Sequence, residues 1–174
     1  MKIAKRICDV IFNILKYVVA ILMIIMVVLT FIEVIRRYFF GQNWIWSEVL
    51  VRYMIVWCTF LGGAAAYRVG QLTKFDLVLN KFNDTVKLIL GIVCDLLLLA
   101  FAAWLISKGV ETFLKPSIAN QISVELGISV RWIYLAIPVG FGCMCLFGIE
   151  RIINEIAELV NLKKTKAAKE VSGK

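Results

Sequence analysis

The chain has 174 residues, of which 61% are hydrophobic, with a mean hydropathy of +0.88 and a formal net charge of +8. A soluble domain of this size is much less apolar, so the composition predicts an integral membrane protein. The basic excess is expected to face anionic membrane lipid and does not indicate nucleic-acid binding. Because the chain contains no histidine, it lacks the imidazoles with which a haem-carrying membrane anchor usually binds its cofactor.

Four long stretches are uncharged apart from Asp95 in the third. They run over residues 17–32, 53–67, 88–107 and 132–149. Each approaches the roughly 20 residues that a helix needs to span a bilayer. The sequence predicts an all-α integral membrane protein with four transmembrane helices in one domain, residues 1–162. A basic cytoplasmic tail, residues 163–174, is expected to be disordered.

Apolar residues continue at helical spacing before the first stretch and after the last one. They are Ile3, Ile7, Val10, Ile11 and Ile14 on one side, and Ile152, Ile153, Ile156, Leu159 and Val160 on the other. This spacing predicts long first and fourth helices that both extend into the cytoplasm.

The turn after the first helix contains Gly41 and Asn43, two residues that favour chain reversal. Trp44 and Trp46 follow, and such amphipathic rings are typical of membrane-interface anchors. Ser47 is then a candidate N-cap for the second helix.

Arg36 and Arg37 end the first helix on the side that carries few basic residues. Two interpretations are open. They pair with Glu33, with Glu48 or with a periplasmic partner, or they bind lipid headgroups.

Glu48 and Arg52 stand four residues apart, so their side chains meet on one helical face. Arg52 lies about 6 Å deeper at 1.5 Å per residue. A charge inside an apolar helix usually faces protein or water and marks function. Arg52 is therefore expected to contact a partner subunit, or else to extend its side chain outward to the headgroups beside Glu48.

Farther along this helix, residues 62–66 are Gly-Gly-Ala-Ala-Ala. Such small residues allow another helix backbone to approach closely. The spacing leaves open whether that helix belongs to this chain or to another one.

Between the second and third stretches, apolar residues repeat every three or four positions at Leu72, Phe75, Leu79, Phe82 and Val86. Lys74 and Lys81 alternate with them and are expected to anchor this segment at the membrane surface. The pattern predicts a short amphipathic helix on the cytoplasmic surface. The alternative is a simple loop.

Asp95 lies about 12 Å beyond Lys87 along the third helix, which places it near mid-membrane. A carboxylate at that depth suggests an ion site or a polar contact. It has no oxygen-rich neighbours in the sequence, so it is alternatively protonated or paired with a group of another subunit.

Polar and apolar residues alternate over residues 121–131, after a break at Lys115 and Pro116. One strand alone is unstable, so this segment is expected to be an extended periplasmic loop pressed on the helices. Trp132 then anchors the fourth helix at the interface, and Pro138 lies inside that helix.

Fourteen basic residues lie on one side of the four stretches and five on the other. By the positive-inside rule, both termini are cytoplasmic. The five cysteines lie in or beside apolar stretches without metal-type spacing, so no metal site and no cofactor are predicted.

One set of residues falls in a familiar order between positions 36 and 145. It comprises Arg37-Tyr38, Phe40-Gly41, Trp46-Ser47-Glu48, Arg52, Trp57, Phe60-Leu61-Gly62, Arg68, Gly70, Asp76, Leu126-Gly127-Ile128, Trp132, Tyr134 and Ile137-Pro138-Val139-Gly140. In this order and spacing the chain resembles the small membrane subunits of TRAP transporters. It departs from the family pattern at Val49, where a second Glu is frequent, and at Leu72, where a His is frequent.

The resemblance implies a helical scaffold subunit of the bacterial inner membrane and no enzyme. It also implies a large multispanning subunit that carries the substrate and sodium sites, and a periplasmic binding protein that delivers an organic acid such as sialic acid or a C4-dicarboxylate. Residues expected at the partner interface are Arg37, Trp46, Glu48, Arg52, Trp57, Gly62 and Arg68. Such a scaffold is expected to be a rigid bundle with one lipid-facing side and one partner-facing side.

Two alternatives remain open at this point. One is a stand-alone four-helix transporter of the small multidrug type, although Glu33 lies at the end of the first helix and not within it. The other is a membrane anchor subunit of a different complex.

Overall fold

The computed structural model describes residues 2–41, 44–70 and 84–172. Within these residues the chain forms the helices α1 (Lys2–Phe40), α2 (Ile45–Arg68), α4 (Asp84–Leu114), α5 (Pro116–Ala119) and α6 (Arg131–Ser172). Four of these helices are long and apolar enough to cross a membrane, over Lys5–Phe40, Ile45–Arg68, Ile89–Leu114 and Arg131–Ala157. The predicted all-α membrane protein with long first and fourth helices is confirmed. The surface helix predicted around Lys74 and Lys81 lies outside the described residues.

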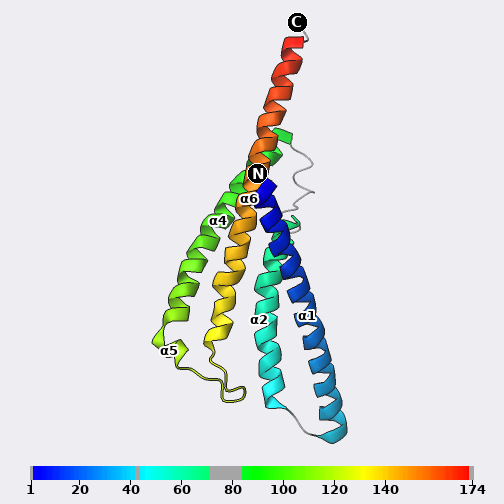
Figure 1. The fold of residues 1–174 in the computed structure, drawn as a ribbon, viewed down its shortest axis with the longest axis vertical. Coiled ribbons are helices and arrows are strands. Elements are labelled where there is room, and N and C mark those ends of the chain that lie inside the picture. The colour runs from blue at the N-terminus through cyan, green and yellow to red at the C-terminus, as the bar shows by residue number, and fades with distance from the viewer. Residues whose placement is uncertain (1, 42–43, 71–83, 173–174) are drawn as a thin grey trace.

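The long helices lie side by side in an open row, in the order α1, α2, α6, α4 (Figure 1). Each helix packs on its neighbour in this row, whereas α4 makes at most marginal contact with α1 and α2 in the described part of the chain. The four membrane helices therefore form an open arrangement, and the rigidity expected of the bundle stays a prediction. In a row, every helix keeps an outward face, because lipid or a partner satisfies apolar side chains that a soluble protein would have to bury.

Small residues on α6 bring the central helices together. A Cβ atom on Gly140 would lie 2.6 Å from Cβ of Phe60 on α2, and one on Gly148 would lie 2.8 Å from a methyl group of Leu99 on α4. By contrast, a Cβ on Gly62 would lie 3.9 Å from the Val19 side chain, and one on Gly63 would meet nothing within 4 Å. The closest helix approaches therefore occur at α6, whereas Gly62 and Gly63 of the predicted small-residue patch on α2 make no such approach, although Ala64 beside them is buried in the core.

The connection from α4 to α6 matches the predicted extended loop. α4 ends at Leu114, the single turn α5 follows, and the next residues pair only through an isolated bridge between Ile122 and Ser129. Gly127, with φ of +65°, makes the turn between them. At the C-terminus, α6 continues to Ser172, past the point where a disordered tail was expected to begin.

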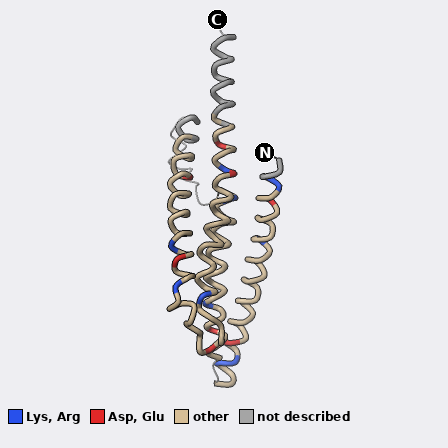
Figure 2. The backbone as a smooth tube through the Cα atoms, turned by 60° about the vertical axis from the view of Figure 1, so that its left-hand side comes forward, with Lys and Arg blue, Asp and Glu red and all other residues tan. Residues whose placement is uncertain are grey.

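Charged residues gather toward the two ends of the row (Figure 2). We call them the Arg68 end, where α1 begins and α2 ends, and the Trp44 end, where α2 begins and α4 ends.

Candidate functional site

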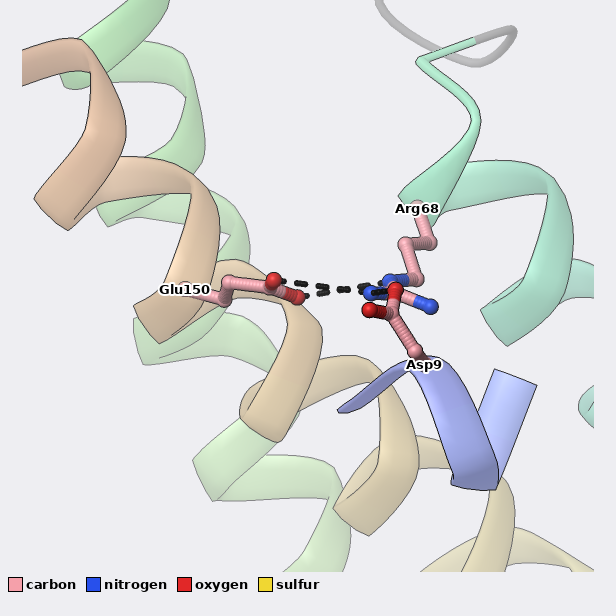
Figure 3. Close-up of polar contacts among 3 residues, drawn as sticks. All are labelled: Asp9, Arg68 and Glu150. Atoms are coloured by element: carbon pink, nitrogen blue, oxygen red, sulfur yellow. Dashed lines mark hydrogen bonds and ion pairs between the residues drawn. The ribbon is translucent and has the colours of Figure 1, made fainter. Parts of the chain in front are cut away.

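Arg68 connects three helices at the Arg68 end (Figure 3). Its Nη2 lies 2.6 Å from Oδ1 of Asp9 on α1, and its Nε lies 3.3 Å from Oε2 of Glu150 on α6. The rings of Phe12 and Phe147 lie 5.2 Å from the guanidinium carbon. The Arg68 side chain is only 14% exposed. Arg68 was predicted at a partner interface, but the contacts it makes here tie α1, α2 and α6 of the same chain together.

A second arginine lies beside a fully buried carboxylate in the same layer. Nε of Arg151 on α6 lies 2.9 Å from Oδ2 of Asp95 on α4, and it donates a 2.9 Å hydrogen bond to Oε1 of Glu155. Asp95 is 0% exposed, and so is Tyr67, whose ring centroid lies 5.7 Å from the Arg151 guanidinium. Asp95 therefore has a cation beside it within its own chain.

Asp95 lies on α4 (Asp84–Leu114), in the half of the helix toward the Arg68 end. Its predicted depth near mid-membrane stays a prediction. Its partner Arg151 directly follows Glu150, which binds Arg68, so both clusters belong to one level near the Arg68 end. We call these residues, Asp9, Tyr67, Arg68, Asp95, Glu150, Arg151 and Glu155, the ionic layer.

A cavity of about 280 Å³ lies in the ionic layer. Its walls are Arg68, Phe147, Glu150, Arg151, Asn154 and Glu155. Each of these carboxylates already lies against an arginine, and the described residues contain no group of three His, Cys, Asp or Glu side chains suited to a metal. The layer is therefore arranged to hold helices together through ion pairs.

Few sequence signals predicted this layer. Arg68 and Asp95 were singled out individually, but Asp9, Glu150, Arg151 and Glu155 were not identified as their partners. The available signal was that each of these charges lies within or at the edge of a predicted membrane helix, where an ionised group is expected to have a partner.

At the Trp44 end, Ser47 is 1% exposed and its Oγ donates a 2.6 Å hydrogen bond to Oε2 of Glu33 on α1. The prediction that Ser47 caps α2 is wrong, because the helix begins at Ile45 after Trp44, and the hydroxyl instead joins the two helices. Arg36 lies 3.7 Å above the Trp44 ring, a cation–π contact that the sequence did not predict.

Glu48 and Arg52 meet at 3.0 Å, as their spacing predicted. Their side chains remain 59% and 69% exposed, so both are open to solvent, lipid or another protein. Arg37 and Trp46 are also exposed, whereas Trp57 packs against the core and Gly62 is half-buried. The predicted interface residues thus divide into an exposed group at the Trp44 end and a more buried group along α2.

Among the predicted membrane-interface anchors, Trp132 is 57% exposed at the start of α6. Trp44 is half-buried, and its ring centroid lies 5.3 Å from that of Trp46. Lys74 and Lys81 lie outside the described residues.

Comparison with known proteins agrees with the order of residues noted above. The family model "Tripartite ATP-independent periplasmic transporters, DctQ component" matches residues 26–158. The sialic acid TRAP transporter permease protein SiaT of Haemophilus influenzae is 31% identical over 114 residues, which cover 62% of this chain and 17% of SiaT.

Two further relatives carry other substrates in their names. The C4-dicarboxylate TRAP transporter small permease protein DctQ of Rhodobacter capsulatus is 28% identical over 108 residues, 60% of this chain and 46% of that protein. The isethionate TRAP transporter permease protein DctMQ of Oleidesulfovibrio alaskensis is 22% identical over 118 residues, 68% of this chain and 18% of that protein. The chain thus spans about half the length, or less, of the curated relatives it matches.

Proposed function

Since the chain belongs to the DctQ component family of tripartite ATP-independent periplasmic transporters, we propose that this small permease component is a scaffold for a large multispanning transport subunit. It is a multi-pass membrane transport protein and not an enzyme. In this proposal the large subunit carries the substrate and sodium sites, and the small subunit enlarges the fixed part of the transporter.

The observation that carries the scaffold proposal is the open row of helices. The most apolar window of α1 has no buried residue within the chain, and α4 contacts essentially α6 and α5 alone among the described elements. Such a row offers long apolar faces, while the ionic layer fixes the spacing of its helices. A second membrane subunit packed along one face would complete the assembly, with lipid on the other.

We place the polar part of the partner contact at Glu48 and Arg52, with Arg37 and Trp46 beside them. This pair is bonded within its helix but is largely exposed, so a partner can cover it without breaking any contact inside the chain. Trp57, Gly62 and Arg68 are more buried within the chain. We propose that they support the helix faces on which the partner packs.

The proposed complex takes up an organic acid that a periplasmic binding protein delivers, driven by the sodium gradient. The substrate classes we propose are sialic acid first and C4-dicarboxylates second, because relatives at 31% and 28% identity carry those names. Asp95 is proposed as a structural contact, so Asp95→Asn in the whole transporter should retain uptake as long as the complex assembles.

The proposed location is the bacterial inner membrane with both termini in the cytoplasm. The basic asymmetry of fourteen residues to five supports this orientation. With the native cysteines replaced, a cysteine at Lys166 should be silent to an impermeant thiol reagent outside intact cells, and one at Ser117 should react. The opposite labelling would invert the topology.

The scaffold proposal is tested by copurification. Arg52→Ala should lower both the yield of the large subunit and uptake, because a desolvated charge that loses its partner costs about 3 to 5 kcal/mol. Lys115→Ala is the matched control, since Lys115 and Glu111 form another exposed pair four residues apart near the same end. A normal yield of active complex from Arg52→Ala would show that Arg52 only reaches the headgroups.

A second experiment separates a scaffold from an autonomous transporter. The chain alone, reconstituted into liposomes with an imposed sodium gradient, should give no organic-acid uptake. Clear uptake there would defeat the scaffold proposal.

A further inference from the structure

A second cavity, of about 380 Å³, lies at the Trp44 end, away from the ionic layer. It is lined by Phe113 in the last turn of α4, Ala119 in α5, Ser129 in the loop, and Arg131 and Trp132 in the first turn of α6. α5 lies at the foot of α4 in Figure 1, and the loop leads from it to α6. The cavity thus lies where two membrane-spanning helices end.

No carboxylate among the described residues balances the charge of Arg131. Its guanidinium carbon lies 3.9 Å from the centroid of the Phe113 ring, and its Nε is covered without a hydrogen-bond acceptor. Among the described residues, Arg131 forms no ion pair, and Glu111 on α4 is already bound to Lys108 at 2.8 Å and Lys115 at 3.6 Å. A half-buried cation against an aromatic face, without an anion, suits a negatively charged ligand.

The backbone around Arg131 is already hydrogen-bonded. Its own N–H donates to Oγ of Ser129 at 3.3 Å, and the next two N–H groups donate to the carbonyls of Ser129 and Val130. Oγ of Ser129 in turn donates to the carbonyl of Ala119 at 3.2 Å. The guanidinium is therefore the group that a ligand would meet, and a planar guanidinium matches the oxygens of a phosphate group.

The surroundings of the cavity indicate which kind of phosphate compound would bind there. The candidate span of α4 ends at Leu114 and that of α6 begins at Arg131, so the guanidinium lies where two candidate spans terminate, which is where a membrane surface is expected. Trp132 lines the cavity and is 57% exposed, and Leu114, which directly follows Phe113 at the end of α4, is 62% exposed. A ligand at this position has its anionic group at Arg131 and apolar surface beside it, which is the chemistry of a phospholipid.

We propose that this cavity binds the headgroup of an anionic phospholipid, with the phosphate on the Arg131 guanidinium and the acyl chains along Leu114 and Trp132. The proposal does not depend on which substrate the transporter carries.

The test is native mass spectrometry of the full chain, released from micelles that contain phosphatidylglycerol or phosphatidylcholine with the same acyl chains. The wild type should retain phosphatidylglycerol in preference, and Arg131→Gln should lower that retention about tenfold, as expected for losing a charge-assisted hydrogen bond. Lys115→Gln, which removes an exposed charge already paired with Glu111, should retain the lipid.

A second variant keeps the charge and fills the cavity. Ala119→Trp should also lose the lipid, with circular dichroism showing that the helices remain folded. Equal retention by wild type and Arg131→Gln, or equal retention of the two lipids, would overturn the proposal. Displacement of the lipid by millimolar inorganic phosphate would identify a free-anion site instead. Loss of the lipid on assembly with the large subunit would show that a protein group occupies the cavity.

Discussion

The two ends of the helix row use charge in different ways. At the Arg68 end, Arg68 and Arg151 bind carboxylates of other helices, and Asp95 is completely buried beside Arg151. At the Trp44 end, the exposed ion pairs join residues of one helix, as in Glu48 with Arg52, while the hydrogen bond from Ser47 to Glu33 connects α2 to α1. The first arrangement stabilises this chain by itself, whereas the second leaves charge available to lipid or a partner.

The largest expected effect lies in the ionic layer. Arg151→Met should lower the free energy of unfolding by about 3 to 5 kcal/mol, because the buried carboxylate of Asp95 then has no cation beside it. Unfolding of the purified chain by SDS in mixed micelles, followed by circular dichroism, measures this change.

A double variant controls for lost packing. Arg151→Met with Asp95→Leu should regain most of the stability, since apolar replacement of a buried ion pair is often neutral or stabilising. Glu155 loses its bond to Arg151 in both variants, so the difference between them reports on Asp95. If the free energy of unfolding of Arg151→Met lies within about 1 kcal/mol of the wild-type value, the ion pairs of the Arg68 end stabilise the chain no more than exposed pairs do.

A smaller effect is expected from the contact between α1 and α2 at the other end. Ser47→Ala should lower the free energy of unfolding by about 1 to 3 kcal/mol, because the carboxylate of Glu33 loses a buried hydroxyl donor. Ser107→Ala is the control, since that exposed hydroxyl bonds only to the Trp104 carbonyl of its own helix. Equal losses of unfolding free energy in Ser47→Ala and Ser107→Ala would mean that the hydrogen bond between α1 and α2 stabilises the chain no more than a bond within one helix.

The exposed pair should matter still less to the isolated chain. Arg52→Ala is expected to change the free energy of unfolding by less than about 1 kcal/mol, since the side chains of Arg52 and Glu48 are both largely exposed. The same SDS titration measures it. A loss above about 2 kcal/mol would place Arg52 among the structural charges and remove the contrast between the two ends.

The smallest effect lies in the loop before α6 and concerns protonation alone. The hydroxyl of Ser123 donates a 2.8 Å hydrogen bond that lowers the pKa of the Glu125 carboxyl. Its contribution is present at neutral pH and is lost as the pH falls through the folded-state pKa. Ser123→Ala should raise that pKa, which a carboxyl carbon NMR titration detects. An unchanged pKa would mean that the hydrogen bond is not formed in solution.

Local patterns determined the helices and the pairs within them. The apolar stretches predicted four spans because lipid contact depends on the composition of each segment, and the four-residue spacing of Glu48 and Arg52 predicted their ion pair. The loop before α6 and the place of Pro138 inside that helix were predictable for the same reason.

Tertiary structure alone decided which helices are neighbours and which charges meet. Arg68 lies 59 residues from Asp9 and 82 from Glu150, so no local spacing predicts their contact. Ser47 fits a helix cap by residue type, yet packing against α1 directs its hydroxyl to Glu33. The open row arises because Gly140 and Gly148 let α2 and α4 approach opposite sides of α6, while the outward faces of α1 and α4 need no cover in a membrane.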